Sequence, residues 1–182
     1  MILGKKTKLV QVSMDYLQEY KRWINDPEVS DMLGLIGFPL STDRERKWVE
    51  ENIAPTESKY NFTILTRKGK PIGNITLREI DYVHRCATLG IMIGEKEYWD
   101  RGYGSDAIDA LLGFAFDTLA MHRVELRALE LNRRALECYK KCGFRIEGRR
   151  RKHWYYKGKY IDDVLMGILS DEWRKSHYKT SK

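Results

Sequence analysis

The sequence has no long apolar run and no low-complexity segment. No stretch approaches the roughly 20 consecutive apolar residues that a membrane-spanning helix needs. The opening MILGKKTKLV reaches a lysine within five residues, so no signal peptide is expected. No Pro-, Gly- or Ser-rich linker divides the chain, which holds only 4 prolines among 182 residues. These absences predict one domain in a cytoplasmic protein without a membrane partner.

Cysteines are few, at Cys86, Cys138 and Cys142, and no CxxC pair or histidine cluster accompanies them. Cys138 and Cys142 are four residues apart, so a helix would place both on one face, as a metal pair requires. Small apolar positions on a packed helix need the same spacing and explain it better. No metal site is therefore predicted.

Acidic residues are outnumbered, 26 against 33 lysines and arginines, and the formal net charge is +7. A basic surface attracts nucleic acid, a membrane face or a phosphorylated cofactor. Much of the excess lies in RIEGRRRKHWYYKGKY, residues 145–160, and in the C-terminal RKSHYKTSK. Basic residues interleaved with aromatic ones are typical of nucleic-acid binding. A solvated strand face followed by a disordered tail explains the same composition better.

Capping residues predict where the first helices begin. Ser13 is positioned to cap a helix from Met14, and Pro27 to open a second, short one. Thr42-x-x-Glu45 matches a capping box for a helix over 42–52.

Alternating apolar and polar residues predict the strands. Two β-rich segments flank the turn 67–71, which indicates a hairpin. The predicted strands are 8–12, 60–66, 72–79, 86–94, 122–129, 144–151 and 159–169, and the later helices are 104–120 and 132–141. This order predicts the α/β (α+β) class, with helices on both faces of a mixed, mostly antiparallel sheet.

The stretch YWDRGYGSDA, residues 98–107, sets Gly102, Gly104 and Ser105 directly before a helical pattern. The first N–H groups of a helix lack intrahelical acceptors, and the helix dipole adds positive potential there. Glycines let the backbone approach an anion without an intervening Cβ. The spacing is not GxxxxGK[ST], which excludes a nucleotide-hydrolase loop, and it matches a Rossmann site poorly. Alone, the stretch supports a phosphate cradle and a plain helix start equally.

A second segment, LNRRALECYKKCGF, covers residues 131–144. Asn132 stands at a predicted helix start, and Tyr139 follows two turns later on the same helix face. A phenol in that position can protonate a departing group. Without the glycine segment, packing of Tyr139 and capping by Asn132 would be the better explanation.

Together the two segments resemble the GNAT superfamily of acyl-CoA-dependent N-acyltransferases. The family's pyrophosphate loop, Gln/Arg-x-x-Gly-x-Gly/Ala, is matched by residues 99–104, with Trp99 first, as in the branch of ribosomal-protein and polyamine acetyltransferases. The signature of that branch is matched by Asn132, Ala135, Tyr139, Lys141, Gly143 and Phe144. The resemblance covers nearly the whole chain in element order and is strongest over 80–144. It implies one GNAT domain over 1–170, a basic tail over 171–182, six to seven strands, and a V-shaped splay between strands four and five.

The resemblance further implies that acetyl-CoA is the cosubstrate and lies in this splay. Backbone groups of residues 91–93 would pair with its pantetheine arm, and those of residues 101–105 would hold its pyrophosphate. Asn132 would contact the arm, and Tyr139 would protonate the leaving thiolate. The implied cofactor-binding residues are Ile91, Met92, Ile93, Trp99, Asp100, Arg101, Gly102, Tyr103, Gly104, Ser105, Asn132, Tyr139 and Lys141.

An acceptor amine arrives protonated, so a base is also needed. Glu79, at the end of a predicted strand, resembles an acidic substrate-side position of polyamine acetyltransferases and is our catalytic candidate beside Tyr139. An ordinary strand-end carboxylate explains it about as well. Thr88 stands where this branch often has Glu, and His84 in the neighbouring loop is a further candidate.

The acceptor itself stays open between a protein N-terminal or side-chain amine and a polyamine or other small amine. Polyamines favour carboxylate-rich pockets. The loop DMLGLIGFPLS contains only Asp31, so protein amines are placed slightly ahead. The other carboxylates that a polyamine pocket could use are Glu79, Asp81, Glu95, Glu97, Asp162 and Asp163.

Two rival functions remain at this level. One is a nucleic-acid or ribosome-binding module using residues 145–160, whose affinity would fall steeply with salt. The other is an acyl-CoA sensor without catalysis, against which Tyr139 argues mildly. Otherwise nucleic acid is expected only through a ribosomal substrate, and a homo-oligomer is left open.

Overall fold

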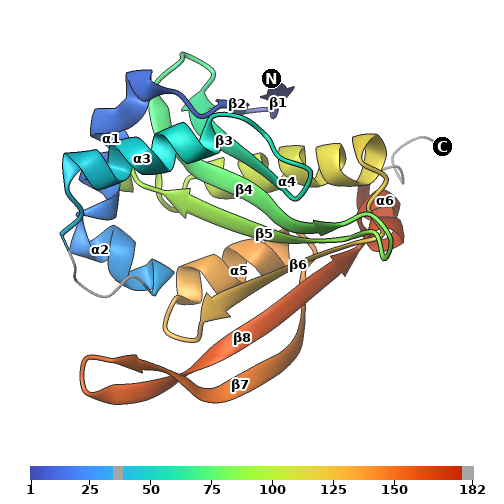
Figure 1. The fold of residues 1–182 in the computed structure, drawn as a ribbon. Helices are drawn as coiled ribbons and strands as arrows, with labels where there is room; N and C mark the ends of the chain where they lie inside the picture. Colours follow the sequence, from blue (N-terminus) through green and yellow to red (C-terminus); the bar gives the residue numbers. More distant parts are fainter. Residues whose placement is uncertain (35–38, 178–182) are drawn as a thin grey trace.

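One mixed sheet of eight strands organises the residues that the structure, a computed structural model, describes: 1–34 and 39–177 (Figure 1). The strands are β1 (Ile2–Leu3), β2 (Thr7–Gln11), β3 (Lys59–Thr66), β4 (Pro71–Asp81), β5 (Cys86–Ile93), β6 (Arg123–Leu129), β7 (Arg145–Tyr156) and β8 (Lys159–Leu169). The α-helices are α1 (Leu17–Ile24), α2 (Pro27–Ser30), α3 (Thr42–Asn52), α4 (Tyr103–Gly113), α5 (Arg133–Lys141) and α6 (Ser170–His177). Single turns of 3₁₀-helix are η1 (Met14–Tyr16), η2 (Asp31–Leu33) and η3 (Lys96–Tyr98), and η4 (Phe114–Thr118) is a π-helical extension of α4.

The strand order is β1-β2-β3-β4-β5-β6-β8-β7, and all neighbours are antiparallel except β5 and β6. These two parallel strands pair only where Cys86–Thr88 meet Arg123–Glu125. Beyond Thr88 the edge of β5 that faces β6 has no strand partner among the described residues. The predicted splay between the fourth and fifth predicted strands is therefore confirmed, and β1 is the strand that the prediction did not count.

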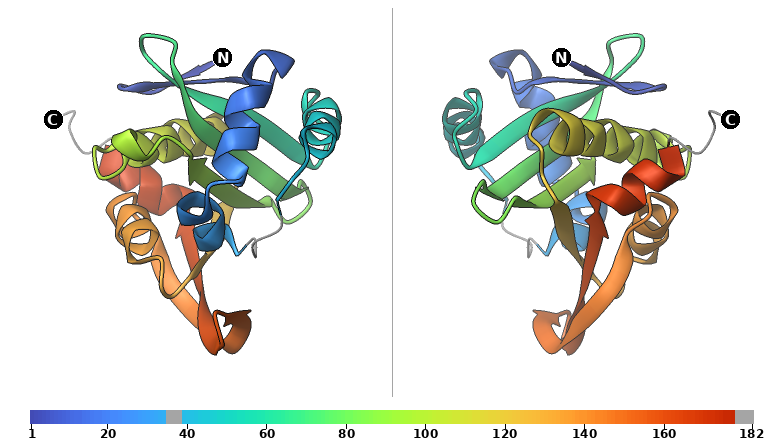
Figure 2. Two further views of the ribbon diagram at one scale, coloured as in Figure 1. Left: turned by 90° about the vertical axis from the view of Figure 1, so that its left-hand side faces the viewer. Right: turned by 90° about the vertical axis from the view of Figure 1, so that its right-hand side faces the viewer.

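Helices cover both faces of the sheet, as predicted. Figure 2 shows α1 and α3 on one side and α4, α5 and α6 on the other. The larger core lies under α4, where Ile108, Leu111 and Leu112 are fully buried. A smaller core joins Tyr20 and Trp23 of α1 to Val49 of α3, because these apolar side chains recur at helical spacing.

The helix starts follow local capping chemistry, with one correction. Ser13 accepts a hydrogen bond from Asp15 N at the start of η1, and Asp26 caps α2 ahead of Pro27. The predicted capping box at Thr42 is wrong: Ser41 caps α3, and its hydroxyl accepts from Arg44 N at 3.2 Å. Glu45 is buried instead of reaching back to the cap, and burial raises the pKa of its carboxyl.

The C-terminal part is more ordered than a tail. Residues from Ser170 form α6, because Trp173 is buried against α4 and its Nε1 donates to Asp109 Oδ1 at 3.0 Å. Parts of the predicted loop 33–40 and of the predicted tail, residues 35–38 and 178–182, lie outside the described residues. Within the described ranges no helix is both long and apolar enough to cross a bilayer.

Candidate active site

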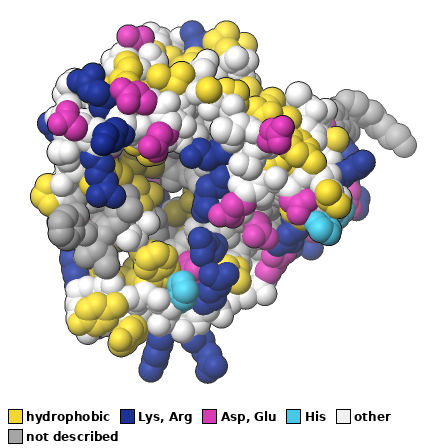
Figure 3. All heavy atoms as spheres, in the orientation of Figure 1, with side chains coloured by type: hydrophobic (Ala, Val, Ile, Leu, Met, Phe, Trp, Pro, Cys, Tyr) yellow, Lys and Arg dark blue, Asp and Glu magenta, His cyan; other side chains and the backbone are white. Residues whose placement is uncertain are grey.

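A cavity of about 720 Å³ lies where β5 and β6 diverge. One half of its wall comes from β5, the start of α4 and the cavity-facing side of α5. The other half comes from α2, η2, β4 and the ends of β6, β7 and β8. Figure 3 shows this face of the molecule hollowed, with basic and apolar side chains around the opening.

The start of α4 offers backbone N–H groups to this cavity. Its N-cap is Gly102, at φ 79°, and no side chain caps the helix. The N–H groups of Tyr103, Gly104 and Ser105 occupy the first turn and so lack intrahelical acceptors. Gly102, Gly104 and Ser105 line the cavity. This is the geometry of an anion site at the positive end of a helix.

A cation that the sequence did not reveal is held beside this helix start. The Asp106 carboxylate accepts hydrogen bonds from the backbone N–H groups of Lys5, Lys6 and Thr7, each at 2.9 Å. This anchor brings Lys6 Nζ to within 2.8 Å of the Arg101 carbonyl oxygen. About a hundred residues separate the two segments in the chain, so no local pattern predicts the contact.

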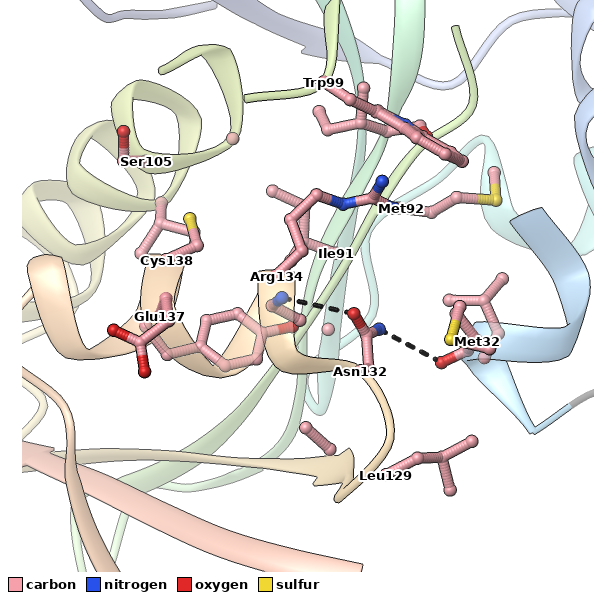
Figure 4. A pocket seen from close by; sticks show the side chains of 18 of the residues that line it. Met32, Ile91, Met92, Trp99, Ser105, Leu129, Asn132, Arg134, Glu137 and Cys138 are labelled. Carbon is pink, nitrogen blue, oxygen red and sulfur yellow. Dashed lines mark hydrogen bonds between the residues drawn. The ribbon is translucent and has the colours of Figure 1, made fainter. Parts of the chain in front are cut away.

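Trp99 and Arg134 form a second fixed pair. Trp99 Nε1 donates to the Ile93 carbonyl oxygen at 2.7 Å, which ties the loop to β5. The Arg134 guanidinium carbon lies 3.5 Å from the centre of the Trp99 ring, a cation–π contact (Figure 4). Burial lowers the pKa of Arg134, opposed by the Asp100 carboxylate. The sequence prediction missed Arg134, although it follows Asn132 on the same helix.

The start of α5, unlike that of α4, is capped. Asn132 Oδ1 accepts from Ala135 N at 3.2 Å, and Asn132 Nδ2 donates to the Met32 carbonyl oxygen at 3.4 Å (Figure 4). Two turns later Tyr139 is 7% exposed and also lines the cavity. Burial raises the pKa of Tyr139, so its hydroxyl keeps its proton at neutral pH. A phenol in this state can donate a proton and cannot act as a base.

Most residues named from the sequence meet in this one cavity. Its lining includes Ile91, Met92, Ile93, Trp99, Asp100, Gly102, Gly104, Ser105, Asn132, Tyr139 and Lys141. Arg101 and Tyr103 do not contribute to the lining. Tyr103 packs edge-on against Tyr98, with ring centres 4.8 Å apart.

Glu79 does not line the cavity, although its neighbour Arg78 does. Glu79 lies in a β-bulge with φ 53°, and its carboxylate pairs with the Arg78 guanidinium. Thr88 Oγ1 donates to Glu79 Oε2 at 2.7 Å, and this hydrogen bond, more than the arginines nearby, lowers the pKa of Glu79. His84 is paired with Asp81 in an exposed turn, and its side chain is 76% exposed.

The other carboxylates considered for a polyamine pocket are mostly used elsewhere. Glu95 pairs with Arg22, Glu97 with Lys70, and Asp31 with Lys157. Asp162 Oδ1 accepts from Lys152 N in the β7–β8 hairpin. Within the described residues, Asp163 is the one member of that set that lines the cavity. The charged lining is Arg78, Arg127, Arg133, Arg134 and Lys141 against Asp100, Glu137 and Asp163.

The basic aromatic segment 145–160 forms β7 and the start of β8. Two of its aromatic residues face the fold: Trp154 lines the cavity, and the Tyr156 hydroxyl donates to Asp31 Oδ2 at 2.8 Å. Tyr155 and Tyr160 are exposed. The segment therefore supplies a wall of the cavity, a role that its composition did not predict.

The two helical cysteines lie between α5 and α4. Cys142 Sγ is 3.8 Å from the Ser105 carbonyl oxygen, and Cys138 lines the cavity. In the described ranges no group of three or more His, Cys, Asp and Glu is arranged to hold a metal ion.

An uncapped helix start and a protonated phenol on one cavity are features of enzymes that bind a phosphorylated cosubstrate and protonate a leaving group. The family model for the acetyltransferase (GNAT) domain matches residues 7–145. The chain belongs to this family of N-acetyltransferases.

Similar proteins carry several names. An uncharacterised prophage-derived N-acetyltransferase of Bacillus subtilis is 28% identical over 153 residues, 84% of each chain. A spermidine N(1)-acetyltransferase of Vibrio cholerae is 32% identical over 112 residues, 62% of this chain and 64% of that protein. A ribosomal N-acetyltransferase-like protein of Bacillus subtilis is 32% identical over 105 residues, 58% of this chain and 57% of its own length.

The fold is also shared with solved structures. The spermidine N-acetyltransferase of Vibrio cholerae, solved in complex with CoA and spermine, superposes with a TM-score of 0.83. The alignment covers 93% of this chain and 99% of that one at 24% identity, which establishes the common fold.

Proposed function

We propose that this chain is an acetyl-CoA-dependent N-acetyltransferase that acetylates a primary amine directly, within a ternary complex. One observation carries the proposal: the uncapped start of α4 and Tyr139 line the same cavity, between the diverging ends of β5 and β6. The first feature fits a pyrophosphate, and the second fits a leaving thiolate. The CoA-bound relative of the same fold supports this reading.

The residues present fit acetyl-CoA. A side chain at Gly104 would project into the space between Ile93 and Cys138, each 3.7 Å from the position of a Cβ. Glycine keeps that space open next to three uncapped N–H groups. Lys6, Arg101 and Arg134 add positive charge around the same loop. The free edge of β5 at residues 91–93 would pair with the pantetheine arm.

Acetyl-CoA supplies a thioester whose carbonyl carbon the neutral amine attacks, so that a C–N bond forms and the C–S bond breaks. Tyr139 gives its phenolic proton to the departing sulfur and regains one from the solvent. The amine loses one proton before attack, and Glu79 is our proposed base for it, acting through water because it stands outside the cavity lining. The nitrogen gives up a second proton to the solvent as the C–S bond breaks and the amide forms. Backbone N–H groups near Ile93 would stabilise the charge that develops on the carbonyl oxygen.

The acceptor belongs to the same proposal. In the half of the cavity away from α4 the lining has Arg78 and Arg127 and the one carboxylate Asp163, so it is not the carboxylate-rich pocket that a polycation favours. We therefore keep a protein amine ahead of a polyamine or another small amine, although several relatives are named as spermidine acetyltransferases.

Two measurements test the function. Millimolar acetyl-CoA should raise the melting temperature, because a ligand that binds only the native state stabilises it. Labelled acetyl-CoA should then transfer its acetyl group to at least one amine among peptides with free N-termini, purified ribosomes and polyamines. No thermal shift, or a shift without transfer to any amine, would remove the assignment in favour of the nucleic-acid module or the sensor.

A further inference from the structure

The end of the cavity away from α4 contains a buried carboxylate that the proposed chemistry does not use. Asp163 on β8 is 2% exposed and lines the cavity. Its Oδ2 has no hydrogen-bond partner among the described residues. The nearest cation is Arg127, whose Nη1 is 4.0 Å away, which is beyond hydrogen-bond distance. A buried carboxylate oxygen without a hydrogen bond is destabilising, so Asp163 is suited to a donor that enters the cavity.

A second unpartnered polar group lines the same cavity. Trp154 Nε1 is buried and has no acceptor among the described residues. Trp154 pairs with Ile161 across the β7–β8 hairpin, and Ile161 precedes Asp163 by two residues. The β7–β8 pairing is irregular between Trp154 and Arg150, and Arg150 is the residue that pairs with Asp163. Trp154 and Asp163 nevertheless both line the cavity from the same hairpin.

The Trp154 ring is fixed by the other wall of the cavity. A Cβ at Gly34, which follows η2, would lie 3.3 Å from the ring. The hairpin and the segment around η2 thus meet at this end of the cavity. An amine substrate bound here would contact two buried groups. Asp163 Oδ2 would accept a hydrogen bond from it, and Trp154 Nε1, on a packed ring, would donate one.

The charge at this end limits what can bind. Arg78, which pairs with Glu79, and Arg127 line the cavity together with Asp163. A polyamine carries several ammonium groups and no hydrogen-bond acceptor, so it would leave Trp154 Nε1 unpaired and find one lining carboxylate here for its several charges.

We infer that Asp163 and Trp154 form the acceptor subsite, and that it selects an amine with one positive charge and a neighbouring hydrogen-bond acceptor, as in the free α-amine of a peptide. Asp163 accepts from the ammonium group, and Trp154 donates to the adjacent carbonyl oxygen. This inference rests on the proposed acetyl transfer and specifies the acceptor class for the same cavity.

The wild-type protein tests this selectivity without any substitution. Three acceptors are compared by kcat/KM at saturating acetyl-CoA: a tripeptide amide with a free α-amine, butylamine and spermidine. The expected order is tripeptide, then butylamine, then spermidine, with at least tenfold between the first and the last. A preference for spermidine over the tripeptide would overturn the inference.

Two variants assign the selectivity to residues. Asp163→Asn should raise the KM for the tripeptide at least tenfold and leave the affinity for acetyl-CoA unchanged. Glu125→Gln is the matched control, because Glu125 lies on the adjacent strand but is exposed and absent from the cavity lining. Trp154→Phe keeps the ring and removes the N–H, so it should lower kcat/KM for the tripeptide and not for butylamine. An Asp163→Asn variant that behaves like Glu125→Gln contradicts the role of Asp163.

Different results would contradict the acetyltransferase function and the acceptor subsite. If acetyl-CoA neither stabilises the wild-type protein nor transfers its acetyl group to any amine, the function itself is wrong. If transfer occurs but favours spermidine, or is insensitive to Asp163 and Trp154, the function stands and the acceptor subsite does not.

Discussion

The two halves of the cavity are built in different ways. The half at α4 and α5 is formed by two helix starts, and its polar groups are mainly backbone N–H groups and residues of two short sequence segments. The half at Asp163 is formed by side chains of η2, β4, β6, β7 and β8. A ligand of the first half would be bound largely by main-chain groups, which do not depend on the identity of a side chain. What the second half binds would change with single substitutions, because its polar groups are individual side chains.

The same contrast exists between the two helix starts. Gly102 leaves the first turn of α4 uncapped, whereas the Asn132 side chain caps the first turn of α5 by accepting a hydrogen bond from Ala135 N. An anion therefore finds free N–H groups at α4. At α5 one of the corresponding N–H groups, that of Ala135, already donates to Asn132. Asn132 also fixes the start of the helix that carries Tyr139.

The largest expected effect is at Tyr139, which α5 contributes to the first half of the cavity. Tyr139→Phe should lower kcat by about 100-fold or more, since a general acid contributes about 10²–10⁴. The affinity for acetyl-CoA, measured by thermal titration, should stay near that of the wild type. Tyr155→Phe removes the same hydroxyl at an exposed site outside the cavity and serves as the control. A kcat for Tyr139→Phe equal to that of the control would show that the cavity uses another acid.

A negative charge introduced at the start of α4 should have the next largest effect, on the affinity for acetyl-CoA. Gly102→Asp sets a carboxylate beside the uncapped N–H groups and should weaken acetyl-CoA binding about tenfold, roughly 1.4 kcal/mol. Gly158→Asp is the matched control: Gly158 also has a positive φ, 83° against 79°, and lies in the β7–β8 turn, where a Cβ would meet no other atom within 4 Å. Both variants place a side chain at a positive φ, and only the first should lose affinity for acetyl-CoA. Equal affinities would mean that the anion binds elsewhere.

Removing the cap of α5 should affect stability more than binding at α4. Asn132→Ala should lower the free energy of unfolding by about 1 kcal/mol, as loss of an N-cap does. Asn132→Asp retains an oxygen that can accept from Ala135 N but loses the donor to Met32 O. Urea unfolding should therefore rank the wild type and Asn132→Asp above Asn132→Ala. If both variants are equally destabilised, the contact with Met32 matters more than the cap.

The smallest expected effect is a shift of the pH profile that depends on Glu79, next to the cavity-lining residue Arg78. The hydrogen bond from Thr88 lowers the pKa of Glu79. Glu79 therefore stays ionised until the pH falls below the ordinary pKa of a glutamate side chain. If Glu79 is the base, kcat/KM should hold from neutral pH down through pH 5 and fall only below about 4.5. Thr88→Val should move this acid limb to higher pH, and Glu79→Gln should abolish it. A limb that survives in Glu79→Gln belongs to another group.

Strands and turns could be predicted where interactions between residues close in the sequence determine them. Apolar alternation and turn residues predicted the hairpin of β3 and β4. The predicted capping box is wrong because Ser41 and Thr42 are both good N-cap residues and a local pattern does not distinguish them; in the structure Ser41 caps the helix and Glu45 is buried. The sequence predicts a basic tail where the structure has α6. Among the charged residues of this helix only Trp173 is buried, so its packing leaves little apolar pattern in the sequence.

The order of the predicted elements is enough to predict the α/β class, and two segments of fewer than fifteen residues predict the loop at 99–104 and Tyr139 as site residues. Long-range packing brings distant groups to these segments, and no local pattern reveals it. Lys6 reaches the α4 loop through Asp106, Trp154 turns inward against Gly34, and Asp163 rather than its neighbour Asp162 faces the cavity. Strand register makes that last choice, because adjacent residues on a strand point to opposite faces, and a register is set by pairing across the whole sheet.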